Sequence, residues 1–241
     1  MAKDKKGRPK VSCIVPAYNE GKTIGNVLRI LNASSLIDEV IVVDDGSKDK
    51  TSLKVRKNFP RVKLVVHSKN KGKADALLTG AKTAENPVLF FCDADLKGLK
   101  QKHIYELINP VVNGKTRMIV GAQEYMNVLR EKKWYRRIFG SLELSELVKK
   151  LGGEKVLFKE DFLKIAGIKG SNYGVEQRIV GYFERNNLPF KYCLLERVGH
   201  VHKFQKWGPK EGFFKEITAL VGFYIHSAKK FLRELFVEKS N

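Results

Sequence analysis

Two carboxylates stand two residues apart directly after an apolar run, in VLFFCDAD (88–95). They are Asp93 and Asp95. A pair at this spacing, where a strand ends in a turn, can reach one divalent cation, because Mg²⁺ and Mn²⁺ prefer oxygen ligands and often combine one or two carboxylates with substrate phosphates. The alternative interpretation is a helix cap and an exposed turn residue.

A second carboxylate pair ends another apolar run, EVIVVDDGS (39–47). Asp44 and Asp45 could accept hydrogen bonds from a ribose or a base N–H, and the Gly-Ser turn after them lets the backbone approach a ligand. The alternative is a turn in which Ser47 or Asp49 caps the next helix. The first apolar run, VSCIVP, is also followed by polar residues, in AYNE.

Apolar runs alternate with amphipathic segments along the chain, which predicts βαβ units and a mostly parallel sheet. The predicted strands span 11–16, 39–47, 62–67, 88–95, 117–122 and 190–196. The predicted helices span 20–33, 72–84 and 173–187, and a strand followed by a helix is expected over 151–167. Ligands bind at the carboxyl ends of strands in such sheets, so the polar groups after the first, second and fourth strands predict one shared site.

The composition limits the class of protein. The chain has 241 residues, 43% hydrophobic and 30% charged, which excludes a disordered tail or a disulfide scaffold. Its net charge of +20 favours polyanionic partners. Three cysteines in apolar runs, Cys13, Cys92 and Cys193, predict buried free thiols in a reducing compartment. The basic first ten residues and the lack of a long apolar run predict a cytoplasmic protein, with a peripheral position on the cytoplasmic face of the membrane as an extension of that prediction.

The chain is predicted to divide into a basic, mobile tail (1–10), one compact domain (11–205) and an amphipathic helical extension (206–241). Aromatic and aliphatic residues recur at helical spacing over 211–236, with lysines and an arginine between them. Such a helix packs on its own domain or on a second copy in a homodimer, or it lies on an anionic membrane surface.

Four segments in order resemble the N-terminal half of family 2 glycosyltransferases of the GT-A fold: VSCIVPAYNEGKTIGNVLRIL, VIVVDDGSKDKT, NKGKADALLTGAK and VLFFCDADL. The resemblance implies an α/β, Rossmann-like domain with a nucleotide-sugar half (11–100) and an acceptor half (101–205). It also implies a metal-dependent hexosyltransferase that uses Mg²⁺ or Mn²⁺ and a nucleotide-diphosphate sugar. A UDP-sugar is the first choice of donor, and GDP-mannose is the alternative.

The resemblance assigns roles to individual residues of the first half. Those matching the segments that contact the nucleotide are Pro16, Ala17, Tyr18, Glu20, Asp44 (base or ribose), Lys73 (near the diphosphate) and Asp93. Asp93 and Asp95 match the metal-binding pair, with Asp95 the more direct ligand and a catalytic residue. A divalent cation and a nearby lysine would stabilise the charge that develops on a diphosphate leaving group.

The second half is similar, in LGGEKVLFKEDF (151–162) and GSNYGVEQRIV (170–180), to the acceptor region of glucosyl-3-phosphoglycerate synthases. The similarity implies acceptor contacts at Gly153, Glu154 and Tyr173, and a further metal ligand at His200 or, alternatively, His202. Lys155 stands where an arginine is common, which weakens the case for bidentate phosphate recognition. The His-x-His pair is otherwise a surface feature of a basic loop.

Glu176 is the best candidate for a general base, which would take the proton of an acceptor hydroxyl as its oxygen attacks the anomeric carbon. Gln177 follows it where many inverting family members have an aspartate. A phosphate or carboxylate acceptor is already ionised and needs no base. A retaining mechanism, or a surface ion pair with Arg178 or Lys169, is the other alternative.

Two acceptor classes remain open. The aromatic C-terminal segment, together with DADL, which resembles dolichol-phosphate mannosyltransferases, favours a lipid phosphate. The Gly-Gly-Glu and YGVE segments favour a small soluble acid such as a phosphoglycerate. The basic cluster over 125–137 has two interpretations. It is a mobile flap that covers the donor diphosphate or holds an anionic acceptor, or it is a solvated loop.

Two other classes of protein fit less well. A nucleic-acid-binding protein would explain the charge, but the chain has no RRM, KH, zinc-finger or helix-turn-helix pattern. Carboxylates gathered at strand ends would also repel a phosphate backbone. A nucleotidyltransferase would place a glycine-rich basic loop after the first strand, and PAYNEG is not such a loop. We therefore expect no nucleic-acid partner.

Overall fold

The computed structural model describes residues 2–4, 7–123, 152–166 and 174–200. Residues 1–200 form one compact unit, and the description below concerns this unit. Several predictions concern residues outside the described ranges: the basic cluster 125–137, Tyr173, His202 and the extension 206–241 with its amphipathic segment 211–236.

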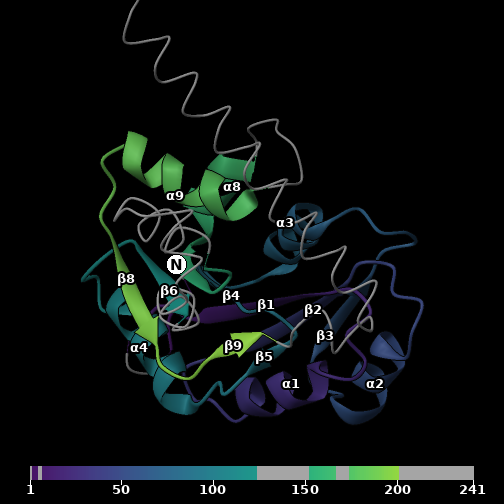
Figure 1. Ribbon diagram of the computed structural model, residues 1–241. Coiled ribbons are helices and arrows are strands. Elements are labelled where there is room, and N and C mark those ends of the chain that lie inside the picture. Colours follow the sequence, from purple (N-terminus) through teal and green to yellow (C-terminus); the bar gives the residue numbers. More distant parts are fainter. Residues whose placement is uncertain (1, 5–6, 124–151, 167–173, 201–241) are drawn as a thin grey trace, which may run out of the picture. The chain divides into compact units, whose positions relative to one another are not determined.

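Strands and helices alternate through most of the described chain (Figure 1). The strands are β1 (Val11–Ala17), β2 (Glu39–Asp44), β3 (Lys63–Val66), β4 (Val88–Phe91), β5 (Leu96–Lys97), β6 (Met118–Gln123), β7 (Lys155–Phe158), β8 (Phe190–Leu195) and β9 (Gly199–His200). The helices are α1 (Ile24–Asn32), α2 (Thr51–Asn58), α3 (Lys73–Thr83), α4 (Gln101–Val112), α8 (Lys159–Ala166) and α9 (Val175–Arg185).

The strands form a seven-stranded sheet in the order β3-β2-β1-β4-β7-β6-β8. The neighbours pair in parallel except at β7, which runs antiparallel to both β4 and β6. The prediction of a mostly parallel sheet is therefore confirmed. A separate two-stranded sheet joins β5 to β9, which the apolar pattern did not reveal.

Helices cover both faces of the sheet, because alternate side chains of each strand point to opposite sides. On one face, Cys13 and Val15 of β1 share an apolar cluster with residues of α1, α2 and α4. On the other face, Ile14 belongs to a cluster with residues of α3, α8 and α9 (Figure 1). Two covered faces explain why the strands are continuously apolar.

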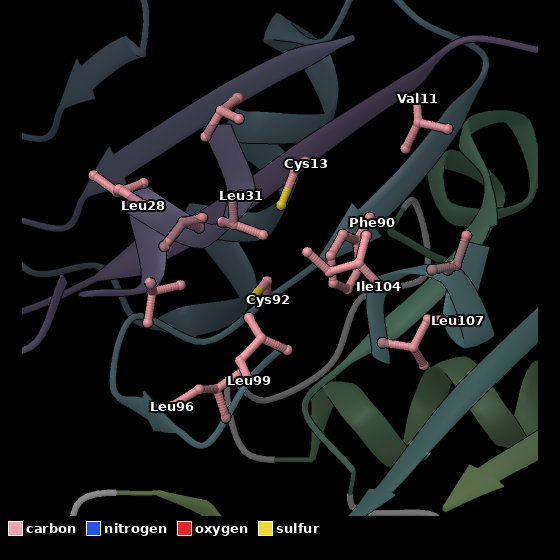
Figure 2. Close-up of a cluster of buried hydrophobic side chains, with 14 of the residues drawn as sticks. Val11, Cys13, Leu28, Leu31, Phe90, Cys92, Leu96, Leu99, Ile104 and Leu107 are labelled. Atoms are coloured by element: carbon pink, nitrogen blue, oxygen red, sulfur yellow. The ribbon is translucent and has the colours of Figure 1, made fainter. Parts of the chain in front are cut away.

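The cluster under α1 and α4 holds two of the three thiols. Figure 2 shows the sulfurs of Cys13 and Cys92 among Leu31, Phe90 and Ile104. Both are buried free cysteines, as predicted, whereas Cys193 on β8 is partly exposed, so the prediction of burial is wrong for that residue. The reason is its position on an edge strand of the sheet.

Two helices were not predicted from periodicity. In α4, buried residues recur at helical spacing (Ile104, Leu107, Ile108 and Val111), although Pro110 lies inside the last turn and is a helix-breaking signal. In α2 only Thr51 and Val55 are buried, so the short helix has a weak apolar face. Packing on the sheet, more than intrinsic propensity, holds such segments in place.

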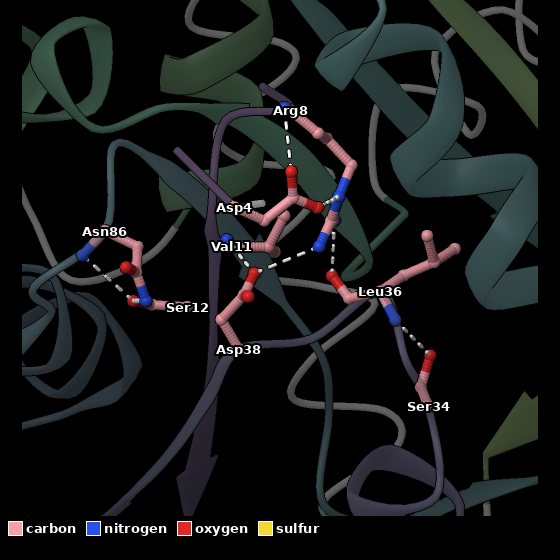
Figure 3. Close-up of polar contacts among 8 residues, drawn as sticks. All are labelled: Asp4, Arg8, Val11, Ser12, Ser34, Leu36, Asp38 and Asn86. Carbon is pink, nitrogen blue, oxygen red and sulfur yellow. Dashed lines mark hydrogen bonds and ion pairs between the residues drawn. The ribbon is translucent and has the colours of Figure 1, made fainter. Parts of the chain in front are cut away.

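The described part of the N-terminal segment, predicted as a mobile tail, is anchored by Arg8 (Figure 3). Its guanidinium donates to Asp4 at 2.9 Å and to the carbonyl of Leu36 at 2.9 Å, and lies 3.3 Å from Asp38. Asp38 also accepts from the amide of Val11, where β1 begins, at 2.8 Å. These contacts fix residues 2–4 and 7–10 beside the start of the sheet. Among the described residues, no helix has the length and apolar character needed to cross a membrane.

Candidate functional site

The candidate site lies at the carboxyl ends of β1, β2 and β4. The register of the sheet pairs Ala17 with Asp44, so the loops that follow β1 and β2 start side by side. The parallel pairing of β1 with β4 brings the loop that contains Asp93 to the same edge. The three polar segments that the sequence predicted to share one site are thus brought together.

The loop after β1 is fastened to the loop after β2. Asn19 has a left-handed backbone with φ of 56°, its amide donates to Ser47 Oγ at 2.8 Å, and its side chain accepts from the amide of Lys48 at 2.8 Å. The amide of Glu20 donates to Thr51 Oγ1 at 2.9 Å. Asn19 was not assigned a role from the sequence, and asparagine's tolerance of positive φ is the signal that marks it.

The residues expected to contact a nucleotide differ in exposure. Pro16 lies within β1 opposite Val43, Ala17 is buried, and Tyr18 is exposed at 37% of its surface. Asp44 is buried, and its carboxylate accepts from the amide of Ser47 at 2.8 Å and from the hydroxyl of Ser52. Asp44 therefore shapes the turn after β2 as well as facing the site edge.

Lys73, Asp93 and Glu176 form the charged centre of the site. The ammonium of Lys73 lies 2.8 Å from Asp93 Oδ1 and 2.9 Å from Glu176 Oε1. Lys73 begins α3, Asp93 follows β4, and Glu176 lies in the first turn of α9. Three elements far apart in the sequence thus converge on one ammonium group. The sequence offered a surface ion pair of Glu176 with Arg178 or Lys169 as one alternative. In the structure Glu176 instead forms an ion pair with Lys73, inside the site.

The electrostatics of the centre follow from this convergence. Burial opposes the charged form of Glu176, but Lys73 and Lys155 outweigh it and lower its pKa to about 2. Burial likewise opposes the charge on Lys73, and Asp93 and Glu176 raise its pKa well above the usual value. All of these charges are held in place by the fold, which is the arrangement that stabilises a developing charge without reorganisation.

The turn before β7 presents its backbone to this centre. At Gly153 a Cβ atom would lie 2.5 Å from Asp93 Oδ2 and 3.3 Å from Lys73 Nζ, so any side chain there would push the Asp93 carboxylate aside. At Gly152 a Cβ would meet the carbonyl oxygen of Gly121 at 1.9 Å. Glu154 is fully buried, and its carbonyl accepts from the amide of Gly121 at 2.8 Å. Of the predicted acceptor contacts, Gly153 lies against Asp93 in the charged centre, and Glu154 is the buried residue that follows it.

Lys155 is a charged residue of the site that sequence reasoning did not select. Its side chain is fully buried, and its ammonium donates to the carbonyl of Gly152. Burial lowers its pKa to about 8, although Glu176 acts in the opposite direction. The available signal was a lysine that opens an otherwise apolar strand, KVLF. Its bond to Gly152 closes the turn that places Gly153 against Asp93.

The small sheet brings the end of the described chain to the segment that follows Asp93 and Asp95. β5 starts directly after Asp95, and its register pairs Leu96 with His200 and Lys97 with Gly199. The backbone of His200 therefore lies beside Leu96, the residue that follows Asp95. Within the described ranges, no three or more His, Cys, Asp and Glu side chains are grouped as a metal site.

The arrangement can hold a diphosphate. Two carboxylates after β4 suit a hard cation, Lys73 supplies a positive charge beside them, and the loops after β1 and β2 border the space where a nucleoside would lie. These are the parts that stabilise a phosphorylated leaving group.

Two relatives of known name are similar to this chain in sequence. A UDP-N-acetylglucosamine–dolichyl-phosphate N-acetylglucosaminyltransferase of Methanococcus voltae is 32% identical over 63% of this chain and 66% of its own length. A dolichol-phosphate mannosyltransferase of Pyrococcus furiosus is 35% identical over 54% of this chain and 38% of its own length. The chain thus spans less than two thirds of the length of both relatives.

The fold also matches a solved structure. Glucosyl-3-phosphoglycerate synthase from Mycobacterium tuberculosis, in complex with Mn²⁺, uridine diphosphate and glucosyl-3-phosphoglycerate, superposes with a TM-score of 0.65 at 25% identity, over 82% of this chain and 73% of the other. The described sheet and helices have the GT-A arrangement that the sequence motifs implied. The family model described as "Glycosyl transferase family 2" matches residues 12–181, well over half of the chain. The protein belongs to glycosyl transferase family 2.

Proposed function

We propose that this glycosyltransferase moves a hexose from a UDP-sugar to a phosphate oxygen of an acceptor, with a lipid phosphate as the preferred acceptor. The single observation that carries the choice of acceptor is the ion pair between Glu176 and Lys73 at 2.9 Å. GDP-mannose is the alternative donor. The domain proposed to do this is 11–205, with its nucleotide-sugar half at 11–100 and its acceptor half at 101–205.

The donor proposal rests on the edge formed by β1, β2 and β4. Tyr18, Glu20 and Asp44 would border the nucleoside, and Lys73 would lie beside the diphosphate. Uridine diphosphate is bound in the superposed synthase, and a UDP-sugar is named for the Methanococcus relative. Both comparisons support the choice of a UDP-sugar.

The residues present fit a divalent cation. Asp93 and Asp95 provide carboxylate oxygens two residues apart, and the pairing of Leu96 with His200 lays the backbone of a candidate third ligand beside the strand that follows Asp95. Asp93 and Asp95 would hold Mg²⁺ or Mn²⁺, which when bound would neutralise charge on the leaving diphosphate. Lys73 would share that task, since its ammonium already contacts Asp93.

The acceptor proposal rests on what Glu176 can do. A general base works best when its pKa is near the working pH, and a carboxylate held by Lys73 with a pKa of about 2 is a weak proton acceptor. A phosphate oxygen is ionised before it reacts and needs no base. It would attack the anomeric carbon, the bond from that carbon to the diphosphate oxygen would break, and UDP would leave. The two dolichyl-phosphate relatives support this chemistry.

A second acceptor is favoured by one observation. The fold match to a glucosyl-3-phosphoglycerate synthase covers 82% of the chain. In that case Glu176 would position a small acid acceptor near Gly153, Glu154 and Tyr173. The amphipathic segment 211–236 would then serve a homodimer, whereas with a lipid acceptor it would contact the cytoplasmic face of the membrane.

The experiment that tests the proposal is a transfer assay with the purified chain. UDP-glucose, UDP-N-acetylglucosamine and GDP-mannose are each offered with Mn²⁺ or Mg²⁺, and product is measured with a polyprenyl phosphate in detergent or with 3-phosphoglycerate. We expect metal-dependent transfer to the polyprenyl phosphate from a UDP-sugar. Transfer to 3-phosphoglycerate alone would replace the lipid acceptor with the soluble one.

Two variants control the assay. Asp95→Asn should abolish metal-dependent turnover, while Glu106→Gln, an acidic residue on α4 outside the site, should leave turnover unchanged. Glu176→Gln separates the two acceptors, because a phosphate nucleophile should tolerate loss of the carboxylate's proton-accepting ability. A pH profile of kcat that loses an acidic limb in Glu176→Gln would instead identify Glu176 as the base and contradict a phosphate nucleophile.

A further inference from the structure

Asp45 is the member of the carboxylate pair after β2 to which the motifs assign no role. It is buried, with 3% of its surface exposed. Its two oxygens accept from consecutive backbone amides, Oδ1 from Lys71 at 2.9 Å and Oδ2 from Gly72 at 2.7 Å. Gly72 precedes the first residue of α3 and has φ of 97°. One carboxylate therefore holds the chain at the point where α3 begins.

His67 extends this contact to the body of the same helix. Its ring is buried at the end of β3, with Nδ1 2.7 Å from Asp45 Oδ1 and Nε2 2.9 Å from the hydroxyl of Thr79. Thr79 lies about two helical turns after Gly72. The helix is thus tied to the sheet at its start and again along its length, through one buried imidazole and one carboxylate.

A close backbone approach fixes the same region. Gly46, with φ of 74°, lies so near residues 69 and 70 that a Cβ would meet the carbonyl carbon of Lys69 at 2.6 Å and the amide nitrogen of Asn70 at 2.8 Å. No L-residue with a side chain fits this position without moving the backbone. The turn after β2 and the approach to α3 therefore move as one piece.

Lys73 is the residue whose place depends on these contacts. It follows Gly72 directly, and its ammonium lies between Asp93 at 2.8 Å and Glu176 at 2.9 Å. Because Lys73 opens α3, a shift or rotation of the helix start moves the ammonium by a comparable amount. Displacements near 1 Å are large on the scale of catalytic positioning.

We propose that Asp45, His67 and Thr79 are positioning residues that set the start of α3 and thereby the place of the Lys73 ammonium. None of the three touches the reacting groups in the proposed function; they act through Lys73. The inference rests on the proposed function in one respect, namely that Lys73 serves the donor diphosphate. Loss of any one of the three contacts lowers kcat more than it raises KM for the donor.

The first test is a set of double-mutant cycles with Lys73→Met. Asp45→Asn replaces one amide acceptor with a donor, and Thr79→Val removes the hydroxyl while Thr79→Ser keeps it. We expect kcat to fall about tenfold in Asp45→Asn and about threefold in Thr79→Val, and to stay within about twofold in Thr79→Ser. In the Lys73→Met background the same changes should alter kcat by less than about twofold, since residues that act through one group are not additive.

The second test needs no turnover. Amide hydrogen exchange at Lys71 and Gly72, and acetylation of Lys73 by an amine-reactive reagent, are followed by mass spectrometry in wild type, Asp45→Asn and Thr79→Val. Lys63, at the other end of the sheet, is the internal reference. We expect faster exchange and at least about threefold faster acetylation of Lys73 in Asp45→Asn, with Lys63 unchanged.

The outcomes separate the inference from the proposed function. Equal losses of kcat in the wild-type and Lys73→Met backgrounds, or unchanged acetylation of Lys73, would overturn the positioning role. A wild-type chain that turns over no nucleotide sugar would overturn the proposed function, and the acetylation result would still decide the inference. If Asp45→Asn does not fold, the Thr79→Val and Thr79→Ser pair carries the same comparison.

Discussion

The two ends of the sheet each hold a lysine between two carboxylates, and they differ in burial. At the carboxyl end, Lys73 lies 2.8 Å from Asp93 and 2.9 Å from Glu176, and both carboxylates are 18% exposed. At the amino end, Lys63 lies 3.4 Å from Glu39 and 2.9 Å from Glu85, and the Glu85 side chain is 76% exposed. The chemical groups are the same, and Glu39 is as shielded as Asp93 and Glu176, with 16% of its side chain exposed. Lys63 and Glu85 are, however, more open to solvent than any member of the Lys73 set.

This difference identifies the functional end. Around Lys63 solvent screens the ion pair with Glu85, so that pair contributes little to stability. Around Lys73 the backbone itself is irregular, with positive φ at Gly46, Gly72 and Gly174, and it holds the charges in a medium where they act strongly. Buried, converging charges on turns that need glycine mark a site, whereas similar charges at regular strand ends mark a surface.

The largest expected effect comes from removing each lysine in turn. Lys73→Met should lower kcat about 10²- to 10³-fold, because it removes a preorganised charge beside the leaving group. Lys63→Met should leave kcat within about twofold, because Lys63 lies at the opposite end of the sheet from the site and solvent screens its 2.9 Å ion pair with Glu85. Steady-state kinetics with the best donor measures both, and circular dichroism verifies the fold. Similar losses in the two variants would remove the distinction between the two ends.

The next effect tests the close approach of backbone to the charged centre. Gly153→Ala should lower kcat about 10- to 100-fold, since its Cβ would lie 2.5 Å from Asp93 Oδ2 and force the carboxylate aside. Gly25→Ala in α1 is the matched control: its Cβ would make an ordinary contact at 3.4 Å with Lys54. We expect the control to raise the free energy of unfolding by about 0.5–1 kcal/mol with kcat unchanged. A fully active Gly153→Ala would refute the proposed crowding.

The sequence was sufficient for the strands of the large sheet and for the loops that meet at its carboxyl edge, because both depend on local patterns. Apolar runs gave the core strands, and polar residues directly after them gave Asp44, Asp93 and the loop after β1. The helix α4 was not predicted, because Pro110 is a local stop signal that packing on the sheet overrides. Propensity is a weak guide where tertiary contacts decide.

The pairing of charges could not be predicted, because it depends on contacts between distant segments. The sequence offered Arg178 or Lys169 as partners for Glu176, by their proximity along the chain, whereas the fold brings in Lys73. The burial of Lys155 is likewise invisible in a strand that could have faced solvent. The pairing of β5 with β9, which brings His200 to Asp95, joins two-residue strands too short to give a pattern.

Acid titration sharpens the comparison through the two glutamates. The pKa of Glu176 is about 2 in the folded chain, against an ordinary value of 4.5. The ionised carboxylate therefore adds about 3 kcal/mol to the free energy of unfolding. This contribution is complete above pH 4.5 and is lost as the pH falls towards 2. In Glu176→Gln this part of the pH dependence should disappear. Lys63 lowers the pKa of Glu85, but that side chain is fully accessible, so Glu85→Gln should leave the acid limb unchanged. Urea unfolding from pH 2 to 6 measures both.

The smallest expected effect comes from the polar contacts of Ser12 with Glu39 and Asn86 at the amino end of the sheet. We expect these contacts to affect stability and not turnover. Ser12 is fully buried, and its hydroxyl donates to Glu39 at 2.5 Å. The same hydroxyl accepts from the side-chain amide of Asn86 at 3.0 Å (Figure 3). Ser12→Ala leaves both partners short of a hydrogen bond inside the protein, and we expect a loss of about 1–2 kcal/mol in the free energy of unfolding. Turnover should stay within about twofold.

Ser34 supplies the control for that variant, because it is also buried but accepts only a long bond, 3.4 Å, from the amide of Leu36. Ser34→Ala should therefore cost less than about 1 kcal/mol. Denaturant unfolding ranks the two variants, and the transfer assay measures their turnover. A fall in kcat for Ser12→Ala without a matching fall in stability would mean that a change at the amino end of β1 shifts the site residues at its carboxyl end. The assignment of activity to the carboxyl end and of stability alone to the amino end would then be wrong, even if every contact at the carboxyl end were right.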